Sequence, residues 1–166
     1  MDSRAILAVL PRLRRYAQAL VGERAGADDL VQDTLERAWT RVSQWRPERD
    51  LGVWLLSIMH NLRIDQIRRP QFSVVSRDEE EVDLPTRPTQ TDHLELRDLA
   101  GALAQLPEEQ RAVLLLVALE EMSYAGVAET LGIPQGTVMS RLARGRERLR
   151  LILDGQTSQA KLRVVK

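Results

Sequence analysis

The chain has 166 residues, enough for one or two small domains, and its 24 basic and 24 acidic side chains balance to a formal net charge of zero. It contains no cysteine, which excludes a disulfide framework and a thiolate metal site. No apolar run approaches the roughly 20 residues of a membrane span and the N-terminal residues lack a signal peptide's apolar core, so we expect a cytoplasmic protein without membrane insertion.

The charge is distributed unevenly along the chain. Residues 1–70 hold 12 arginines against 9 acids, a net charge of +3, and residues 96–166 hold 10 basic against 8 acidic side chains, a net charge of +2. Between them, residues 71–95 hold 2 arginines against 7 acids, a net charge of −5, together with two prolines. We therefore predict small domains at 1–70 and 96–153, joined by a flexible acidic linker and followed by a fraying tail at 154–166.

Helical periodicity predicts an all-α fold. Aromatic residues make up only 4% of the chain, and the alternating apolar and polar runs typical of strands are not evident. We expect helices near 3–21, 27–43, 50–69, 95–104, 107–120, 123–131 and 134–153.

The segment from Asp28 to Arg41 predicts a helix with two different faces. The apolar positions that share one broad face are Leu30, Val31, Thr34, Leu35, Ala38 and Trp39. A polar, largely acidic stripe with i, i+3, i+4, i+7 spacing consists of Asp29, Gln32, Asp33 and Glu36. A solvated face explains the stripe equally well, because acids in a first helical turn complement the helix dipole. As a docking surface, it suits a basic partner.

The segment from Asp50 to Arg69 is divided in the same way. Its expected core stripe comprises Leu51, Leu55, Ile58, Met59 and Leu62, and another face carries Asn61, Asp65 and Arg68, with Arg69 at the end. The loop ahead of it places Trp45 beside Arg46 and Arg49, a combination that suits unstacked single-stranded bases. Asparagine and arginine also reach base edges and phosphates, although arginines near a helix C-terminus stabilise its dipole without any function. Trp39 and Trp54 are expected as core or boundary residues, whereas Trp45 is ambiguous.

The segment from Ser123 to Arg150 predicts a helix-turn-helix. Ala128 allows two helices to cross closely, Gly132 turns the chain between them, and Val138 packs back between the helices. From Pro134 to Leu153 the chain holds five arginines against one glutamate, a net charge of +4. A two-helix unit with a basic second helix suits the major groove of DNA. The alternative is an ordinary helical hairpin with a solvated arginine face.

Three passages resemble the extracytoplasmic-function, or group 4, sigma factors of bacterial RNA polymerase. ADDLVQDTLERAW (27–39) is similar to the helix that grips the polymerase clamp helices, residues 45–69 resemble the part that melts and reads the minus-ten element, and residues 106–150 resemble the minus-thirty-five domain. The resemblance implies a protein that binds core RNA polymerase and promoter DNA, directs promoter-specific transcription initiation and is controlled by a cognate anti-sigma factor. It also implies a response to stress or envelope signals, and part of residues 10–38 resembles the general-stress subgroup of alphaproteobacteria.

The resemblance implies roles for the residues of the acidic stripe, of the segment 45–69 and of the basic helix. Contacts with core polymerase are expected from Asp29, Gln32, Asp33 and Glu36. Contacts with the minus-ten element are expected from Trp45, Arg46, Arg49, Asn61, Asp65, Arg68 and Arg69. Contacts with the minus-thirty-five element are expected from Gln135, Thr137, Ser140, Arg141, Arg144 and Arg148, with Arg150 at a phosphate. Gly52 stands where members often place a basic residue before the tryptophan, which leaves that position without a side chain to contact a phosphate.

Two other function classes are alternatives. A conventional transcriptional regulator would share the helix-turn-helix, but it usually has a ligand-binding or receiver domain, which residues 1–70 do not resemble. An enzyme is the more distant alternative, because His60 and His93 are the only histidines and the chain has no P-loop, glycine-rich phosphate cradle or metal-ligand cluster. We therefore expect no catalytic activity, no cofactor and no metal.

Overall fold

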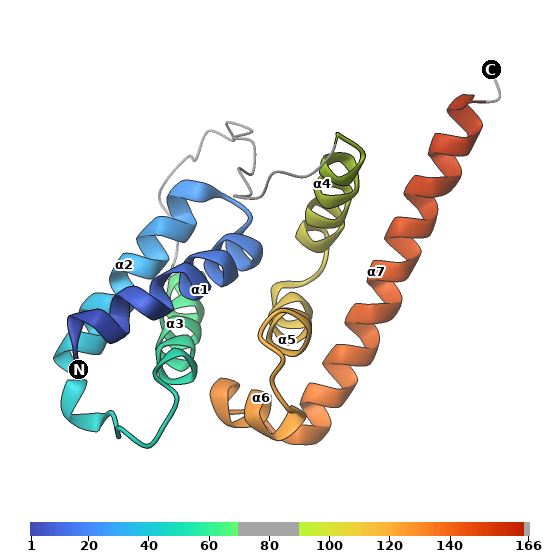
Figure 1. Ribbon diagram of the computed structural model, residues 1–166. Coiled ribbons are helices and arrows are strands. Elements are labelled where there is room, and N and C mark those ends of the chain that lie inside the picture. The colour runs from blue at the N-terminus through green and yellow to red at the C-terminus, as the bar shows by residue number, and fades with distance from the viewer. Residues whose placement is uncertain (70–89, 165–166) are drawn as a thin grey trace. The chain divides into compact units, whose positions relative to one another are not determined.

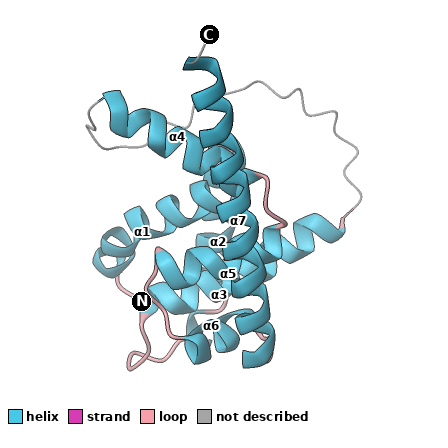
Figure 2. Ribbon diagram, turned by 90° about the vertical axis from the view of Figure 1, so that its right-hand side faces the viewer, coloured by secondary structure: helices cyan, strands magenta, loops and turns pink. Residues whose placement is uncertain are grey.

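The computed structural model describes residues 1–69 and 90–164. Within these residues every regular element is helical and no strand occurs (Figure 2). The N-terminal unit contains α1 (Ser3–Val21), α2 (Arg24–Thr40), the short 3-10 helix η1 (Val42–Gln44) and α3 (Leu51–Arg68). We use the term C-terminal unit for the helices that follow residue 89, which are α4 (Gln90–Ala104), α5 (Glu108–Ala118), α6 (Tyr124–Leu131) and α7 (Gln135–Val164) (Figure 1). The predicted all-α fold with two small domains is confirmed, whereas the acidic linker lies outside the described residues from 71 to 89.

The N-terminal unit is a three-helix bundle in which α1, α2 and α3 pack against one another (Figure 1). Its core consists mainly of side chains with no exposed surface, including Leu13, Leu20, Leu30, Leu55 and Met59. Tyr16 on α1 and His60 on α3 share a buried hydrogen bond, with 2.6 Å between the tyrosine hydroxyl and Nε2. The bundle therefore fixes the outer faces of α2 and α3, on which the candidate site residues lie.

The C-terminal unit packs α7 against α4 and α5. Gly145 permits the close approach of α7 to α5, because a Cβ there would lie 3.1 Å from Cδ1 of Leu114. The guanidinium of Arg111 donates hydrogen bonds of 2.8 to 3.1 Å to the carbonyls of Leu103, Ala104 and Leu106, which satisfies acceptors at the end of α4.

The turn between α6 and α7 has the backbone geometry that glycine favours. Gly132 has a φ of +66°, and the N–H of Ile133 donates to the carbonyl of Ala128 at 3.1 Å, the bond that closes a Schellman motif. Val127 and Val138 are fully buried and Ala128 is half-buried. Pro134 precedes α7 instead of lying in its first turn, and its carbonyl accepts from the N–H of Val138 at 3.2 Å.

Two expected boundaries in the C-terminal unit are wrong. The helix expected to end at 153 continues to Val164, so the tail from 154 to 164 is helical instead of frayed. Its composition of glutamine, alanine, lysine, leucine and arginine favours a helix strongly enough to tolerate Gly155. At the other end, α4 begins at Gln90, so the last residues assigned to the linker belong to a helix that starts shortly after Pro88.

No helix in the described ranges carries an apolar stretch long enough to cross a lipid bilayer.

Candidate functional site

The acidic stripe lies on the solvent-facing side of α2. Its members Asp29, Gln32, Asp33 and Glu36 are all exposed. The opposite face of the helix enters the core through Leu30, Val31 and Ala38, and the hydroxyl of buried Thr34 donates to the Leu30 carbonyl at 2.6 Å. Burial of one face thus presents the whole stripe on one surface.

Trp39 is exposed, which corrects the expectation that it is a core or boundary residue. Half of its surface is accessible, whereas Leu35 and Trp54 are half-buried. Trp39 follows Glu36 by three residues and Gln32 by seven, so it flanks the acidic stripe on the outer side of the helix. The apolar face expected from the sequence ends at Trp39, whereas the buried part of α2 ends at Ala38.

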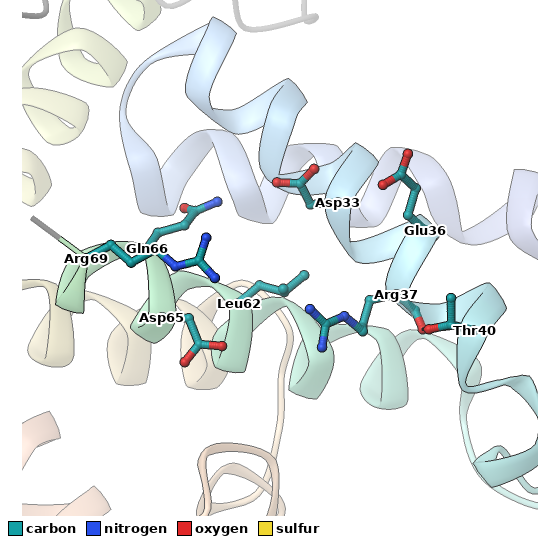
Figure 3. A pocket seen from close by; sticks show the side chains of 8 residues that line it. All are labelled: Asp33, Glu36, Arg37, Thr40, Leu62, Asp65, Gln66 and Arg69. Atoms are coloured by element: carbon teal, nitrogen blue, oxygen red, sulfur yellow. The ribbon is translucent and has the colours of Figure 1, made fainter. Parts of the chain in front are cut away.

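Polar residues of α3 lie beside the acidic stripe. Asn61, Asp65, Arg68 and Arg69 are all exposed. A hollow of about 300 Å³ lies between α2 and α3, and its lining residues are Asp33, Glu36, Arg37, Thr40, Leu62, Asp65, Gln66 and Arg69 (Figure 3). The structure therefore brings Asp33 and Glu36, expected at polymerase, next to Asp65 and Arg69, expected at DNA. Arg37 was not singled out from the sequence; it extends from α2 toward α3 (Figure 3) and is four residues from Asp33.

Two exposed isoleucines of α3 were also missed. Ile64 and Ile67 have 39% and 57% of their surface accessible, and they alternate with Asn61, Asp65 and Arg68 along the helix. Apolar residues in a helical pattern are expected to be buried, but the core does not cover the end of α3. The sequence pattern therefore did not indicate that these two isoleucines are exposed. Apolar side chains among polar ones suit contact with base faces and thymine methyl groups.

The loop before α3 is a short turn anchored at both ends. The Arg49 N–H donates to the Arg46 carbonyl at 2.9 Å, and both side chains are exposed. At the end of the loop the carboxylate of Asp50 accepts from the Val53 N–H at 3.0 Å and caps α3. That hydrogen bond is the main reason that the pKa of Asp50 is lowered, and the charge of Arg12 lowers the pKa further.

Trp45 stands at the start of this loop and is half-buried. Its indole Nε1 is buried and has no hydrogen-bond partner among the described residues. The nitrogen edge of the ring therefore points inward, which leaves only the rest of the ring for stacking on a base.

The start of α7 presents a mixed polar and basic surface. Gln135, Ser140, Arg144 and Arg148 are exposed, whereas Thr137 and Arg141 are half-buried. Arg141 forms an ion pair with Glu109 of α5 at 3.3 Å, so the base contact expected of it requires this ion pair to open. The Ser140 hydroxyl donates to the Gly136 carbonyl at 3.0 Å and keeps its oxygen available as an acceptor.

Arg150, expected at a phosphate, has two acidic partners on its own helix. It is paired with Glu147 at 2.7 Å and with Asp154 at 3.2 Å, and this pairing lowers the pKa of Glu147. Met139, with 52% of its surface accessible, is an apolar member of the α7 surface that the sequence analysis did not single out.

Comparison with known proteins agrees with this two-domain arrangement. Residues 6–60 match the family described as the Sigma2 domain of PhyR, and residues 96–149 match Sigma-70, region 4. The ECF RNA polymerase sigma factor EcfG of Rhodopseudomonas palustris is 38% identical over 149 residues, which cover 89% of this chain and 82% of the relative. SigL of Mycobacterium tuberculosis, another ECF sigma factor, is 38% identical over 148 residues, which cover 85% and 82%.

Solved structures show the same likeness. The sigma factor RpoE of Bartonella quintana, solved with the anti-sigma factor NepR, is 34% identical with a TM-score of 0.74, covering 91% of this chain and 95% of that chain. CnrH, solved with the cytosolic domain of CnrY, is 27% identical with a TM-score of 0.66, covering 92% and 86%.

The helical bundle with its polar outer surface and the separate helix-turn-helix domain define a sigma factor, a DNA-binding regulator of transcription. The identity and coverage of the relatives show that the chain belongs to the extracytoplasmic-function sigma factors of bacterial RNA polymerase. Its function is to bind core RNA polymerase and promoter DNA and to direct promoter-specific transcription initiation.

Proposed function

We propose that the acidic stripe of α2 is the surface by which this sigma factor binds core RNA polymerase. The observation that carries the proposal is the joint exposure of Asp29, Gln32, Asp33 and Glu36 on one face of a helix whose other face is buried. Exposed Trp39 beside the stripe supplies an apolar anchor, since interface energy concentrates in aromatic residues surrounded by polar ones. The partner surface is therefore basic with an apolar recess.

The loop and the end of α3 form the proposed minus-ten surface. Trp45, Arg46 and Arg49 supply a ring face and charges for an unstacked strand, and Asn61, Asp65, Arg68 and Arg69 line the adjoining face of α3. Opening a promoter requires unstacking of bases, which costs a few kcal/mol. Contacts with the exposed bases and backbone repay that cost without a nucleotide-driven step.

The start of α7 is the proposed minus-thirty-five surface. Its residues are Gln135, Thr137, Ser140, Arg141, Arg144 and Arg148. Arg144 is the strongest candidate for a base contact, because it is exposed and forms no ion pair with a described residue. Backbone N–H groups at Gln135 and Gly136, at the start of α7, suit a phosphate.

The chain acts by binding, in the cytoplasm where core polymerase works, and not as an enzyme. His60 is 5% exposed and bonded to Tyr16, so it is not placed to exchange protons with a substrate. Regulation comes from a cognate anti-sigma factor, as the complex of the similar sigma factor RpoE with NepR suggests. The likeness to EcfG and to the Sigma2 domain of PhyR supports a role in a stress response.

Two substitutions separate the proposed surfaces in transcription assays with core polymerase. Asp33→Arg is expected to weaken polymerase binding and to lower transcription from every cognate promoter. Arg144→Ala is expected to cost about 1–3 kcal/mol of promoter binding and to affect only promoters that depend on the minus-thirty-five element. The promoters come from sequencing of the transcript starts that the chain produces on pooled genomic DNA.

Matched controls are available on the same helices. Asp28→Arg makes the same charge change as Asp33→Arg on an exposed residue off the stripe, and Arg146→Ala removes an exposed arginine from another side of α7. Both controls are expected to retain wild-type activity. The same promoter-selective defect from Asp33→Arg and Arg144→Ala would show that the stripe is not the polymerase surface. Duplex DNA binding without any binding to core polymerase would instead indicate a stand-alone regulator.

A further inference from the structure

Arg12 and Gly52 lie against each other where α1 meets the start of α3. The guanidinium of Arg12 occupies the space of the side chain that Gly52 lacks: a Cβ built on Gly52 would collide with Nη1 of Arg12 and lie 3.0 Å from its Cζ. Glycine inside a helix is otherwise less favourable than alanine. The absence of a side chain at this buried position therefore makes room for an arginine from another helix.

Arg12 reaches the loop through Asp50. Its Nη1 donates to Oδ1 of Asp50 at 3.2 Å, and the same oxygen accepts from the Val53 N–H at 3.0 Å. A Cβ on Gly52 would also approach this Oδ1, at 3.1 Å. One carboxylate oxygen thus connects α1, the end of the loop and the first turn of α3. The Arg12 side chain is 28% exposed and the Asp50 side chain is 59% exposed, so this is a surface ion pair whose geometry is set by the space above Gly52.

Asp50 is the downstream end of the loop that carries Trp45, Arg46 and Arg49. The hydrogen bond between the Arg49 N–H and the Arg46 carbonyl closes a turn immediately before Asp50. Because the turn is this short, the position of Asp50 determines where the exposed guanidinium groups of Arg46 and Arg49 stand. A change at Arg12 is therefore transmitted to the loop over a few covalent bonds.

We propose that Arg12 is a positioning residue for recognition of the minus-ten element. It holds Asp50, and through Asp50 the loop from Trp45 to Asp50, in the arrangement that receives the unpaired strand. Gly52 is required because a side chain there displaces Arg12 from Asp50. This inference rests on the proposed minus-ten surface and extends it to α1, a helix without an assigned role in promoter recognition.

The test is a double-mutant cycle on the full chain bound to core polymerase. The variants are Arg12→Ala, Gly52→Ala and the two combined, and the probe is forked promoter DNA with an unpaired minus-ten strand. Each single variant is expected to weaken binding of this probe roughly tenfold, the change that corresponds to about 1.4 kcal/mol. The combined variant is expected to bind no more weakly than Arg12→Ala alone, because Gly52→Ala has no contact left to disrupt.

Further variants separate positioning from general packing. Arg12→Lys keeps a cation near Asp50 and is expected to retain most of the probe binding that Arg12→Ala loses. Asp50→Asn keeps an oxygen for the Val53 N–H but removes the charge that faces Arg12. It should therefore weaken probe binding as much as Arg12→Ala does. Arg15→Ala, which removes an exposed arginine from the same helix, is the matched control and should have no effect. Affinity for core polymerase and the melting temperature should remain at wild-type values in all of them.

Three results would overturn the proposal. These are additive losses in the double-mutant cycle, an equal loss from Arg15→Ala, and a fall in polymerase affinity or melting temperature that accounts for the weaker probe binding. Binding of the forked probe by the wild-type chain on core polymerase tests the proposed function itself. If it binds core polymerase but not the forked probe, the proposed minus-ten surface fails, whatever the variants do.

Discussion

Acidification is expected to destabilise the N-terminal unit through His60. Burial lowers the pKa of this imidazole to about 4, whereas the pKa is about 6.5 in the unfolded chain. Below about pH 6.5 the unfolded state therefore binds a proton that the folded state excludes. Stability is fully present above that pH and falls as the pH approaches the folded pKa, by up to about 1.4 kcal/mol per pH unit. Between about pH 7 and about pH 4 the loss attributable to His60 is about 3 kcal/mol.

Urea unfolding followed by tryptophan fluorescence measures this effect in the N-terminal unit, because all three tryptophans, Trp39, Trp45 and Trp54, lie in it. His60→Gln is the control: its amide can still bond to the Tyr16 hydroxyl, but it cannot titrate. The difference in the free energy of unfolding between wild type and variant should be independent of pH above pH 6.5. Below pH 6.5 it should change steadily, because only the wild type loses stability through His60. Identical pH profiles for the two proteins would refute the assignment of the loss to His60.

Glycine positions and the charge of α7 give further expectations. Gly132→Ala should lower the free energy of unfolding of the C-terminal unit by about 1–2 kcal/mol in thermal melts followed by circular dichroism, because φ at this position is +66°. Gly136→Ala, at a site with open space around it, should not be destabilising. Gly145→Val should cost about 1–3 kcal/mol in the same melts, because its side chain would press on Leu114. Binding of minus-thirty-five duplex DNA should weaken with salt with a log–log slope near −2, about −0.9 for each of Arg144 and Arg148, and a slope near −4 would show that the ion pairs of Arg141 and Arg150 also open.

The sequence was sufficient for the helices and for the turn of the helix-turn-helix, because these depend on local rules. The apolar period of 3.6 predicts buried faces such as that of Leu55 and Met59, and Gly132 predicts a left-handed residue at the end of a helix. Helix ends were less predictable. The extension of α7 to Val164 depends on summed propensity over a segment without a strong stop signal, which periodicity does not detect.

Contacts between helices distant in sequence could not be predicted. Nothing in the segments around Arg12 and Gly52 indicates that a guanidinium fills the space above a glycine 40 residues later, and only the packing of α1 on α3 brings them together. The exposure of Trp39 has the same origin, since its apolar character fits the buried stripe and only the extent of the bundle decides otherwise. The residues expected on the acidic stripe needed no such information, because exposure follows once the opposite face is buried.

The number of α7 arginines without an acidic partner limits how tightly this sigma factor can bind duplex promoter DNA. The sequence shows five arginines between Pro134 and Leu153, but Arg141 is engaged with Glu109, and Arg150 lies between Glu147 and Asp154. Of the other three, Arg146 lies on another side of the helix, so Arg144 and Arg148 supply only a modest, salt-sensitive affinity for duplex DNA. We therefore expect specific use of a promoter to depend on holding this domain and the proposed minus-ten surface on one polymerase, where the second contact forms at a high effective concentration. We expect the isolated helix-turn-helix to bind duplex DNA weakly, so that the chain is not retained on DNA that lacks polymerase.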